Sequence, residues 1–197
     1  MGRNTCAALV AGTLVFLLTA SASAAELRFI EVDREKDRYT LRSVTWFDAD
    51  QDAVYAVLSN YDLFHRFSSA IVESKNLDPD EQGRPEYFNR MEGCVLFWCR
   101  SFIRVGHLNL EPIGRIDAVA DPERSDFRFA KESWQLREEE NGTLLIYEFE
   151  MSPDFWVPPV IGPYYIKRAL RSGGEKAVGR IEALAIEEQA TRTARQP

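Results

Sequence analysis

The sequence predicts an α+β fold in which a long C-terminal helix lies on a curved antiparallel sheet. Segments of strand composition follow one another from residue 86 to residue 151, separated by turn residues. Two short helical segments, 51–58 and 61–67, precede this run of strands. Apolar residues then recur at helical spacing from Ile166 to Ala185. A sheet and a helix that pack in this way can leave a gap between them in which a ligand binds.

Residues 1–24 have the features of a Sec-type signal peptide. Arg3 supplies the positive charge, residues 7–20 form an uncharged apolar run, and Ala22-Ser23-Ala24 fits the small-residue cleavage pattern. The run is shorter than the roughly 20 apolar residues that span a bilayer. We expect cleavage before Ala25 and a periplasmic protein; the alternative is an uncleaved membrane anchor.

The first half of the mature chain contains two strands and two short helices. Residues 25–37 are a charged arm with room for one strand, and residues 39–47 have strand composition. Asp48 or Asp50 can cap the helix at 51–58, and a second short helix covers 61–67. A strand at 70–77 then leads into the turn-forming residues DPDEQGRP, 78–85.

The second half predicts a run of antiparallel strands and one long helix. The expected strands are Glu86–Met91, Phe102–Leu110, Gly114–Ala120, Phe127–Leu136 and Thr143–Met151. Residues 152–163 contain four prolines and therefore form no regular element. The helix that follows is loosened at Gly173-Gly174, and residues 191–197 are a polar tail. Residues 38–190 are thus one domain.

Composition excludes some classes of function. The net charge of −7 argues against a nucleic acid partner, because phosphate binding needs a basic face. Three cysteines and two histidines argue against a disulfide scaffold and against a His-rich metal site. We therefore expect no metal and no cofactor.

Two stretches of the chain resemble the START-like (SRPBCC) superfamily. Val54 to Leu77, VYAVLSNYDLFHRFSSAIVESKNL, is similar to its opening helices and strand. Ser125 to Pro159 is similar to a second hallmark, a strand ending in a tryptophan, a Gly-Thr turn and a strand ending in Pro-Asp. The resemblance extends over about residues 38–188 and is nearest to the coenzyme Q-binding and polyketide cyclase-like branch.

This resemblance implies a helix-grip fold. A six- or seven-stranded sheet, with two short helices after its first strand, wraps the C-terminal helix around an elongated apolar cavity. Members bind sterols, phospholipids, quinones or polyketides there, and some are enzymes. The sequence departs from the family at Ser68-Ser69, where a proline is usual, and in its signal peptide.

Strand alternation and helical spacing select the residues that line such a cavity. Phe127 and Phe129 have the same parity, whereas Trp134 has the opposite one unless a bulge intervenes. The alternative for every member of the set is ordinary core packing. The expected cavity residues are Phe102, Arg104, Leu108, Phe127, Phe129, Leu145, Tyr147, Phe149, Met151, Ile166 and Leu170.

Cys94 and Cys99 are expected to form a disulfide. A straight strand would hold them about 16 Å apart, which is too far for a disulfide. A tight hairpin would place them opposite each other, and an oxidising compartment favours the bond. Its tip would then present Phe97 and Trp98.

The proline-rich segment is a second candidate for the cavity mouth. Its Phe155 and Trp156, with Lys167 beyond them, suit a lipid headgroup boundary. We expect Phe97, Trp98, Phe155, Trp156 and Lys167 to lie at the cavity mouth or to contact a membrane. The alternative is that these aromatic side chains only fasten the helix to the sheet.

No sequence motif identifies a catalytic centre. The chain has no G-x-S-x-G, no H-E-x-x-H and no phosphate-binding loop. Its histidines are His65, on a short helix, and His107, on a strand. Glu132, Arg104 and Tyr147 can form a polar cluster, but their spacing does not single them out. We assign no catalytic residue.

The sequence therefore predicts a periplasmic protein that binds or carries a lipid or isoprenoid quinone without chemistry. Arg104, Tyr147 and Lys167 are expected to orient the polar head of the ligand. One alternative is a polyketide cyclase/dehydrase-like enzyme, which a buried ionisable cluster facing an open cavity would favour. Another is a docking module for a membrane or a protein, which a filled core with apolar patches around Trp98 and Trp156 would favour.

Overall fold

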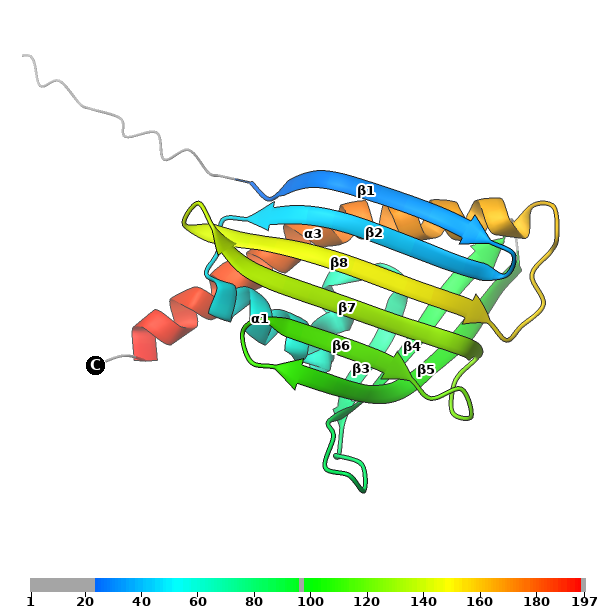
Figure 1. Ribbon diagram of the computed structural model, residues 1–197, viewed down its shortest axis with the longest axis horizontal. Helices are drawn as coiled ribbons and strands as arrows, with labels where there is room; N and C mark the ends of the chain where they lie inside the picture. The colour runs from blue at the N-terminus through cyan, green and yellow to red at the C-terminus, as the bar shows by residue number, and fades with distance from the viewer. Residues whose placement is uncertain (1–23, 96–97, 196–197) are drawn as a thin grey trace, which may run out of the picture.

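An eight-stranded antiparallel sheet curves around the C-terminal helix (Figure 1). This computed structural model describes residues 24–95 and 98–195. The expected signal peptide, apart from Ala24, lies outside the described residues, as do Leu96 and Phe97. The predicted α+β helix-grip fold is confirmed, although the sheet has eight strands and not six or seven.

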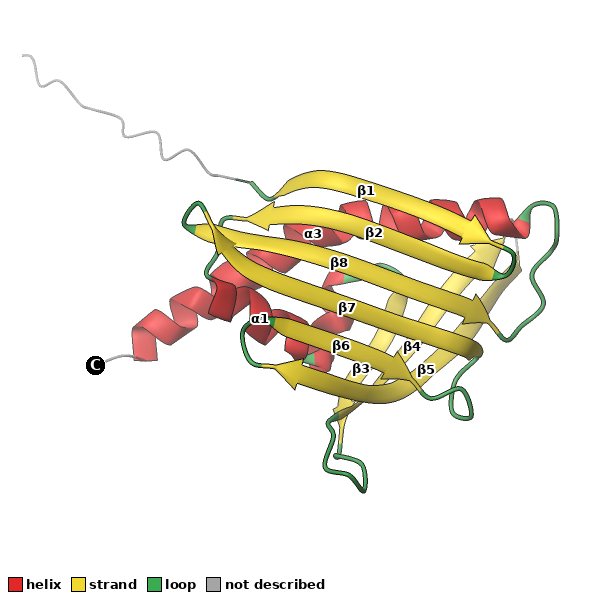
Figure 2. Ribbon diagram, in the orientation of Figure 1, coloured by secondary structure: helices red, strands yellow, loops and turns green. Residues whose placement is uncertain are grey.

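The elements follow one another in the predicted order. The strands are β1 Glu26–Glu35, β2 Arg38–Phe47, β3 Ile71–Leu77, β4 Glu86–Val95, β5 Trp98–Glu111, β6 Arg115–Ala120, β7 Phe127–Glu139 and β8 Gly142–Pro153. The helices are α1 Gln51–Ser59, the 3₁₀ turn η1 Tyr61–Leu63, α2 Phe64–Phe67 and α3 Gly162–Arg195. In the sheet the strands lie side by side in the order β1-β2-β8-β7-β6-β5-β4-β3. Figure 2 shows the helices gathered on one face of the sheet.

The charged arm forms β1, an edge strand. It pairs with β2 from Glu26 opposite Trp46 to Glu35 opposite Arg38. Most of its side chains are exposed, and Val32 is its one fully buried residue, which explains its charged composition. The strand lies along α3, where Gly174 leaves no side chain between the two elements. Helix α3 continues past this glycine and through the expected tail to Arg195.

The buried apolar residues form two groups. The inner group lies beneath α1 and α2 and includes Phe47, Tyr61 and Ile116. The outer group lies toward the proline-rich segment and is composed of Val32, Tyr39, Leu41, Ala120, Phe127, Ala130, Phe149 and Met151. Met91 and Tyr147 pack against both groups. The interior is therefore continuous from one end of the sheet to the other.

A register shift in β7 decides which of its residues face the interior. The pairing with β8 shifts between Phe127 and Phe129. After the shift, Ala130, Glu132 and Trp134 are buried. Trp134 has the parity opposite to that of Phe127, so both can face inward only if a bulge lies between them. The register shift is that bulge.

Candidate ligand-binding site

An ion pair lies inside the sheet. Nη1 of Arg104, on β5, is 2.5 Å from Oε1 of Glu132, on β7. The two side chains are only 3% and 7% exposed. The strand between them, β6, presents the small residues Ala118 and Ala120 to the interior. The long arginine side chain can therefore cross β6 and reach the carboxylate.

Further polar groups complete the cluster. The hydroxyl of Tyr61 donates to Oε2 of Glu132 at 3.4 Å. The side-chain amide of Asn89 can be oriented so that both its oxygen and its nitrogen form hydrogen bonds. In that orientation the oxygen accepts from Nη2 of Arg104 at 3.1 Å, and the nitrogen donates to the Phe88 carbonyl at 3.0 Å. These contacts hold the guanidinium and the carboxylate in fixed positions.

One donor of this cluster is not used. Among the described residues, Nε of Arg104 is buried and has no hydrogen-bond acceptor. The guanidinium lies 5.6 Å from the ring centre of Tyr87 and 5.5 Å from that of Phe149. Aromatic faces attract a cation but do not replace an acceptor. The cluster therefore keeps one buried N–H available for an oxygen atom.

The protonation states of the cluster follow from burial and from the ion pair. Burial alone would lower the pKa of Arg104, but the Glu132 carboxylate and the phenols of Tyr87, Tyr61 and Tyr147 together outweigh burial, and the pKa is raised. Burial, reinforced by Glu132, raises the pKa of Tyr61, Tyr87 and Tyr147. Arg104 is therefore a cation and the three phenols are neutral throughout the physiological pH range.

A small apolar pocket lies at one end of the interior. Its volume is about 240 Å³. It is a half-open pocket between the ends of β4 and β5, the first turns of α3 and residues 154–161, which we call the proline loop. The lining residues are Gly93, Cys94, Arg100, Phe102, Phe155, Trp156, Val157, Pro158, Gly162, Tyr165, Ile166 and Ala169.

Aromatic rings separate this pocket from the ion pair. The ring of Phe155 stacks on that of Phe102 with centroids 4.1 Å apart, and its edge meets Phe127 at 6.0 Å. The guanidinium of Arg100 lies 5.8 Å from the ring centres of both Phe102 and Phe155. Phe102 and Arg104 are two residues apart on the same face of β5, which places them about 7 Å apart. Phe102 therefore lines the pocket on one side and neighbours Arg104 on the other.

The predicted disulfide is confirmed. Cys94 and Cys99 are bonded and lie opposite each other in the register of β4 and β5. Cys94 also lines the pocket, so the bond fixes the two strand ends that form its wall. Phe97 lies outside the described residues, and nothing is described of the Trp98 side chain. Their expected membrane contact stays a prediction.

Exposed apolar side chains continue from the proline loop onto α3. Trp156 is 71% exposed and Val160 is 89% exposed, and Ile161 and Tyr164 are also exposed. Beside them, a groove of about 590 Å³ is lined by Val32, Tyr164, Lys167, Arg168, Arg171, Ser172 and Glu175. Lys167 therefore lies in this neighbouring groove and not in the pocket itself. Arg171 pairs with Glu175, whereas Lys167 and Arg168 form no ion pair within the described chain.

The other cavity residues expected from the sequence mostly face the interior. Leu108, Phe127, Leu145, Phe149 and Met151 are buried, and Phe102, Tyr147, Ile166 and Leu170 are partly buried against them. The expectation that Phe129 shares a face with Phe127 is wrong, because the register shifts between the two residues. The guanidinium of Arg38, an exposed residue, lies 4.6 Å from the ring centre of Phe129.

Three polar members of the cluster were not predicted from the sequence. Tyr87 and Asn89 share one face of β4, and this alternation was a usable signal. Tyr61 is in the short turn η1 and reaches a carboxylate 71 residues further along the chain. No local pattern indicates a contact of that kind.

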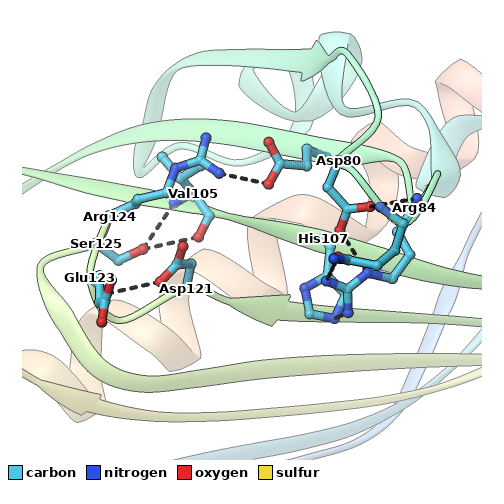
Figure 3. Close-up of polar contacts among 10 residues, drawn as sticks. Asp80, Arg84, Val105, His107, Asp121, Glu123, Arg124 and Ser125 are labelled. Atoms are coloured by element: carbon cyan, nitrogen blue, oxygen red, sulfur yellow. Dashed lines mark hydrogen bonds and ion pairs between the residues drawn. The ribbon is translucent and has the colours of Figure 1, made fainter.

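Neither histidine is part of this site. His65 is exposed on α2. His107 lies on β5 with the parity opposite to that of Arg104, and its Nε2 is 3.1 Å from Nη1 of Arg84 (Figure 3). Arg84 in turn pairs with Asp80 at 2.7 Å. The described residues contain no group of three His, Cys, Asp or Glu side chains suited to a metal ion. Within the same residues, no helix is long and apolar enough to cross a membrane.

Comparisons with known proteins agree with this geometry. Residues 47–163 match the protein family described as "Polyketide cyclase / dehydrase and lipid transport". The fold is similar to that of human STARD10, with a TM-score of 0.61, 10% identity, and coverage of 88% of this chain and 78% of that one. No match was found among curated proteins.

Two bacterial structures are also similar. A STAR-related lipid transfer protein from Xanthomonas axonopodis gives a TM-score of 0.52 at 15% identity, covering 81% of this chain and 98% of that one. The Zhui aromatase/cyclase from Streptomyces sp. R1128 gives a TM-score of 0.51 at 12% identity, covering 81% of this chain and 97% of that one. At these identities the likeness is one of fold.

Proposed function

Since this chain belongs to the polyketide cyclase/dehydrase and lipid transport family of the START-like superfamily, we propose that it binds and carries one apolar small molecule without transforming it. The ligand is a lipid or an isoprenoid quinone, held between the sheet and α3. The observation that carries this proposal is the unpaired Nε–H of Arg104, in a polar cluster that is surrounded by buried apolar side chains. Such a donor suits an oxygen atom on the head of a largely apolar ligand.

The route from the pocket to Arg104 supports binding in the interior. A pocket of about 240 Å³ is small for a lipid. A larger ligand would have to displace Phe155 from Phe102, and an apolar chain would replace the contacts that the rings lose. Each Å² of apolar surface that the ligand buries contributes about 25 cal/mol. Phe155 is the ring that can move, because it belongs to the proline loop and not to a strand.

The proline loop is suited to opening. Its prolines cannot donate backbone hydrogen bonds. Its backbone is held at the β8 side by the bond from Asp154 to the Asp126 carbonyl, and at the α3 side by the bonds from Gly162 to Pro158 and from Tyr165 to Ile161. The loop can therefore move outward without breaking the hydrogen bonds of the sheet.

Exposed side chains beside the loop support loading from a membrane. Trp156 and Val160 present apolar surface, and Lys167 and Arg168 present positive charge on a chain whose net charge is −7. Apolar and basic groups side by side favour an anionic lipid surface. The disulfide and the expected signal peptide together support a periplasmic location.

The alternative is a cyclase or dehydrase, and the Arg104–Glu132–Tyr61 cluster favours it. General acid–base catalysis works best when the pKa of the catalytic group is near the working pH. Burial moves the pKa values of Tyr61 and its neighbours away from neutrality, and no histidine is near. The cluster is better suited to hold a ligand head than to transfer its protons.

The test is native mass spectrometry with lipid extraction on protein exported to the periplasm of a Gram-negative host. We expect one lipid or quinone per chain. The variant Ala169→Trp adds a large side chain at a residue that lines the pocket and should lose the ligand, whereas Ala183→Trp, at an exposed residue of the same helix that does not line it, should keep the ligand. A clean protein mass that does not change after incubation with lipids and quinones would refute carriage. A chemically altered ligand would favour the enzyme.

A further inference from the structure

A buried carboxylate on α3 holds the beginning of the folded chain. Glu182 is only 7% exposed. Its Oε2 accepts from the backbone nitrogen of Ala25 at 2.8 Å, and its Oε1 accepts from that of Asp48 at 3.1 Å. Within the described residues it forms no ion pair with a lysine, arginine or histidine side chain. A buried carboxylate that lacks a cationic partner is costly.

Ala25 is also the residue at which the fold begins. Its side chain packs against the inner core group, whereas Ala24 is exposed. Strand pairing starts one residue later, with Glu26 opposite Trp46. Among the described residues, the step from an exposed to a packed residue therefore falls at the Ala24–Ala25 bond. The same bond follows Ala22-Ser23-Ala24, the small-residue cleavage pattern in the sequence.

We propose that the chain is cleaved between Ala24 and Ala25 and that the new α-ammonium group of Ala25 forms an ion pair with Glu182. A signal peptidase would hydrolyse the amide with one water molecule. Ala24 takes the hydroxyl as a carboxyl group, and Ala25 takes the hydrogen as an amine, which is protonated at neutral pH. The nitrogen needs no new position, because it is already 2.8 Å from the carboxylate.

The consequence is that processing stabilises the fold. Before cleavage the carboxylate accepts a bond from a neutral amide; afterwards it accepts one from a cation, and charge-assisted bonds are stronger. The bond joins the start of β1 to α3, and Asp48 joins the β2–α1 connection to the same carboxylate. The unfolding equilibrium constant of the cleaved chain should fall about fivefold relative to the uncleaved chain.

The first experiment identifies the N-terminus. The full chain is expressed in a Gram-negative host, and the protein recovered from the periplasm is sequenced from its N-terminus and weighed intact. A chain that begins at Ala25 is expected. A different first residue, or an intact leader, would overturn the proposal.

The second experiment measures the ion pair. Chains that begin at Ala25 and at Ser23 are compared by chemical denaturation, each with Glu182 and with Glu182→Gln. The fivefold difference should be present with Glu182 and absent with Glu182→Gln. The control Glu187→Gln, which changes an exposed carboxylate on the same helix, should preserve it. Equal stability of the two wild-type chains, or a difference that survives Glu182→Gln, would refute the pairing.

A third measurement does not depend on any variant. The α-amino nitrogen of the Ala25 chain is labelled with ¹⁵N, which leaves its chemistry unchanged, and its titration is followed by NMR. The Glu182 carboxylate should raise its pKa above the usual range of about 7.7–8.0. A value within or below that range would contradict the ion pair.

Discussion

Replacing Arg104 alone should destabilise the protein far more than replacing Arg104 and Glu132 together. Arg104→Met leaves a buried carboxylate with only the 3.4 Å contact from Tyr61. Unit charges about 4 Å apart attract by about 4 kcal/mol at an effective dielectric constant of about 20. Breaking one side of a buried pair costs a similar 3–5 kcal/mol. That is about a fifth or more of the free energy of unfolding of an ordinary domain, which is roughly 5–15 kcal/mol.

The double variant Arg104→Met/Glu132→Met removes both charges and fills the space with apolar atoms. Its free energy of unfolding should lie within about 1 kcal/mol of the wild type, because replacing a buried ion pair by packed apolar groups is often neutral. Urea denaturation followed by tryptophan fluorescence measures the free energy of unfolding of each variant. Trp134 is a buried fluorophore near the ion pair.

For the single variant Arg104→Met, the unfolding temperature should also fall, by roughly 8–16 °C.

An exposed ion pair provides the control. Arg128 bonds to Asp37 and Asp154 on the surface, so Arg128→Met should leave the denaturation midpoint almost unchanged. The reasoning fails if Arg104→Met costs less than about 1 kcal/mol. It also fails if the effects of Arg104→Met and Glu132→Met simply add in the double variant, since residues in contact should show coupling.

Three further outcomes are expected. Replacing Cys94 and Cys99 by Ser should lower the free energy of unfolding by about 2 kcal/mol, because the bond closes only a short loop; an unchanged denaturation midpoint would contradict this. Burial and the neighbouring Arg84 hold the pKa of His107 below its usual value. As the pH falls, His107 therefore binds a proton more readily in the unfolded chain than in the folded chain. Stability should therefore fall as the pH drops from 7 to 5, and thermal unfolding of His107→Gln should show a flatter pH profile. Gly106→Ala should cost about 2 kcal/mol or more, because its Cβ would lie 2.0 Å from a carbonyl oxygen of the next strand. Gly114→Ala, in open space, is the control for chemical denaturation.

The fold class could be predicted because its signals are local. The helical spacing of apolar residues in α3 and the alternation in β8 are read from neighbouring residues alone, and they do not depend on how these elements pack. The disulfide was predictable from geometry, because Cys94 and Cys99 can meet only across a hairpin. The full length of strand β1 was harder to predict, because an edge strand keeps most of its side chains in water and its composition is therefore charged.

The site was only partly predictable. Arg104, Glu132 and Tyr147 were candidates for a cluster, and the structure brings the first two together across β6. The inward position of Glu132 depends on the bulge near Phe127, which alternation alone does not locate. Tyr61 joins through a contact that only the tertiary fold creates.

The division of the interior into two groups has a consequence for exchange with solvent and with ligand. Residues of the inner group such as Ala53 and Ile116 are fully buried, whereas the outer group is closed in part by the half-buried Phe155. A local opening can therefore release the outer end while the inner end stays intact. The time that a ligand stays bound would then be set by the rate of that local opening. It would not depend on how rarely the whole chain unfolds, so if the protein carries a ligand as we propose, it can be stable and still exchange that ligand quickly.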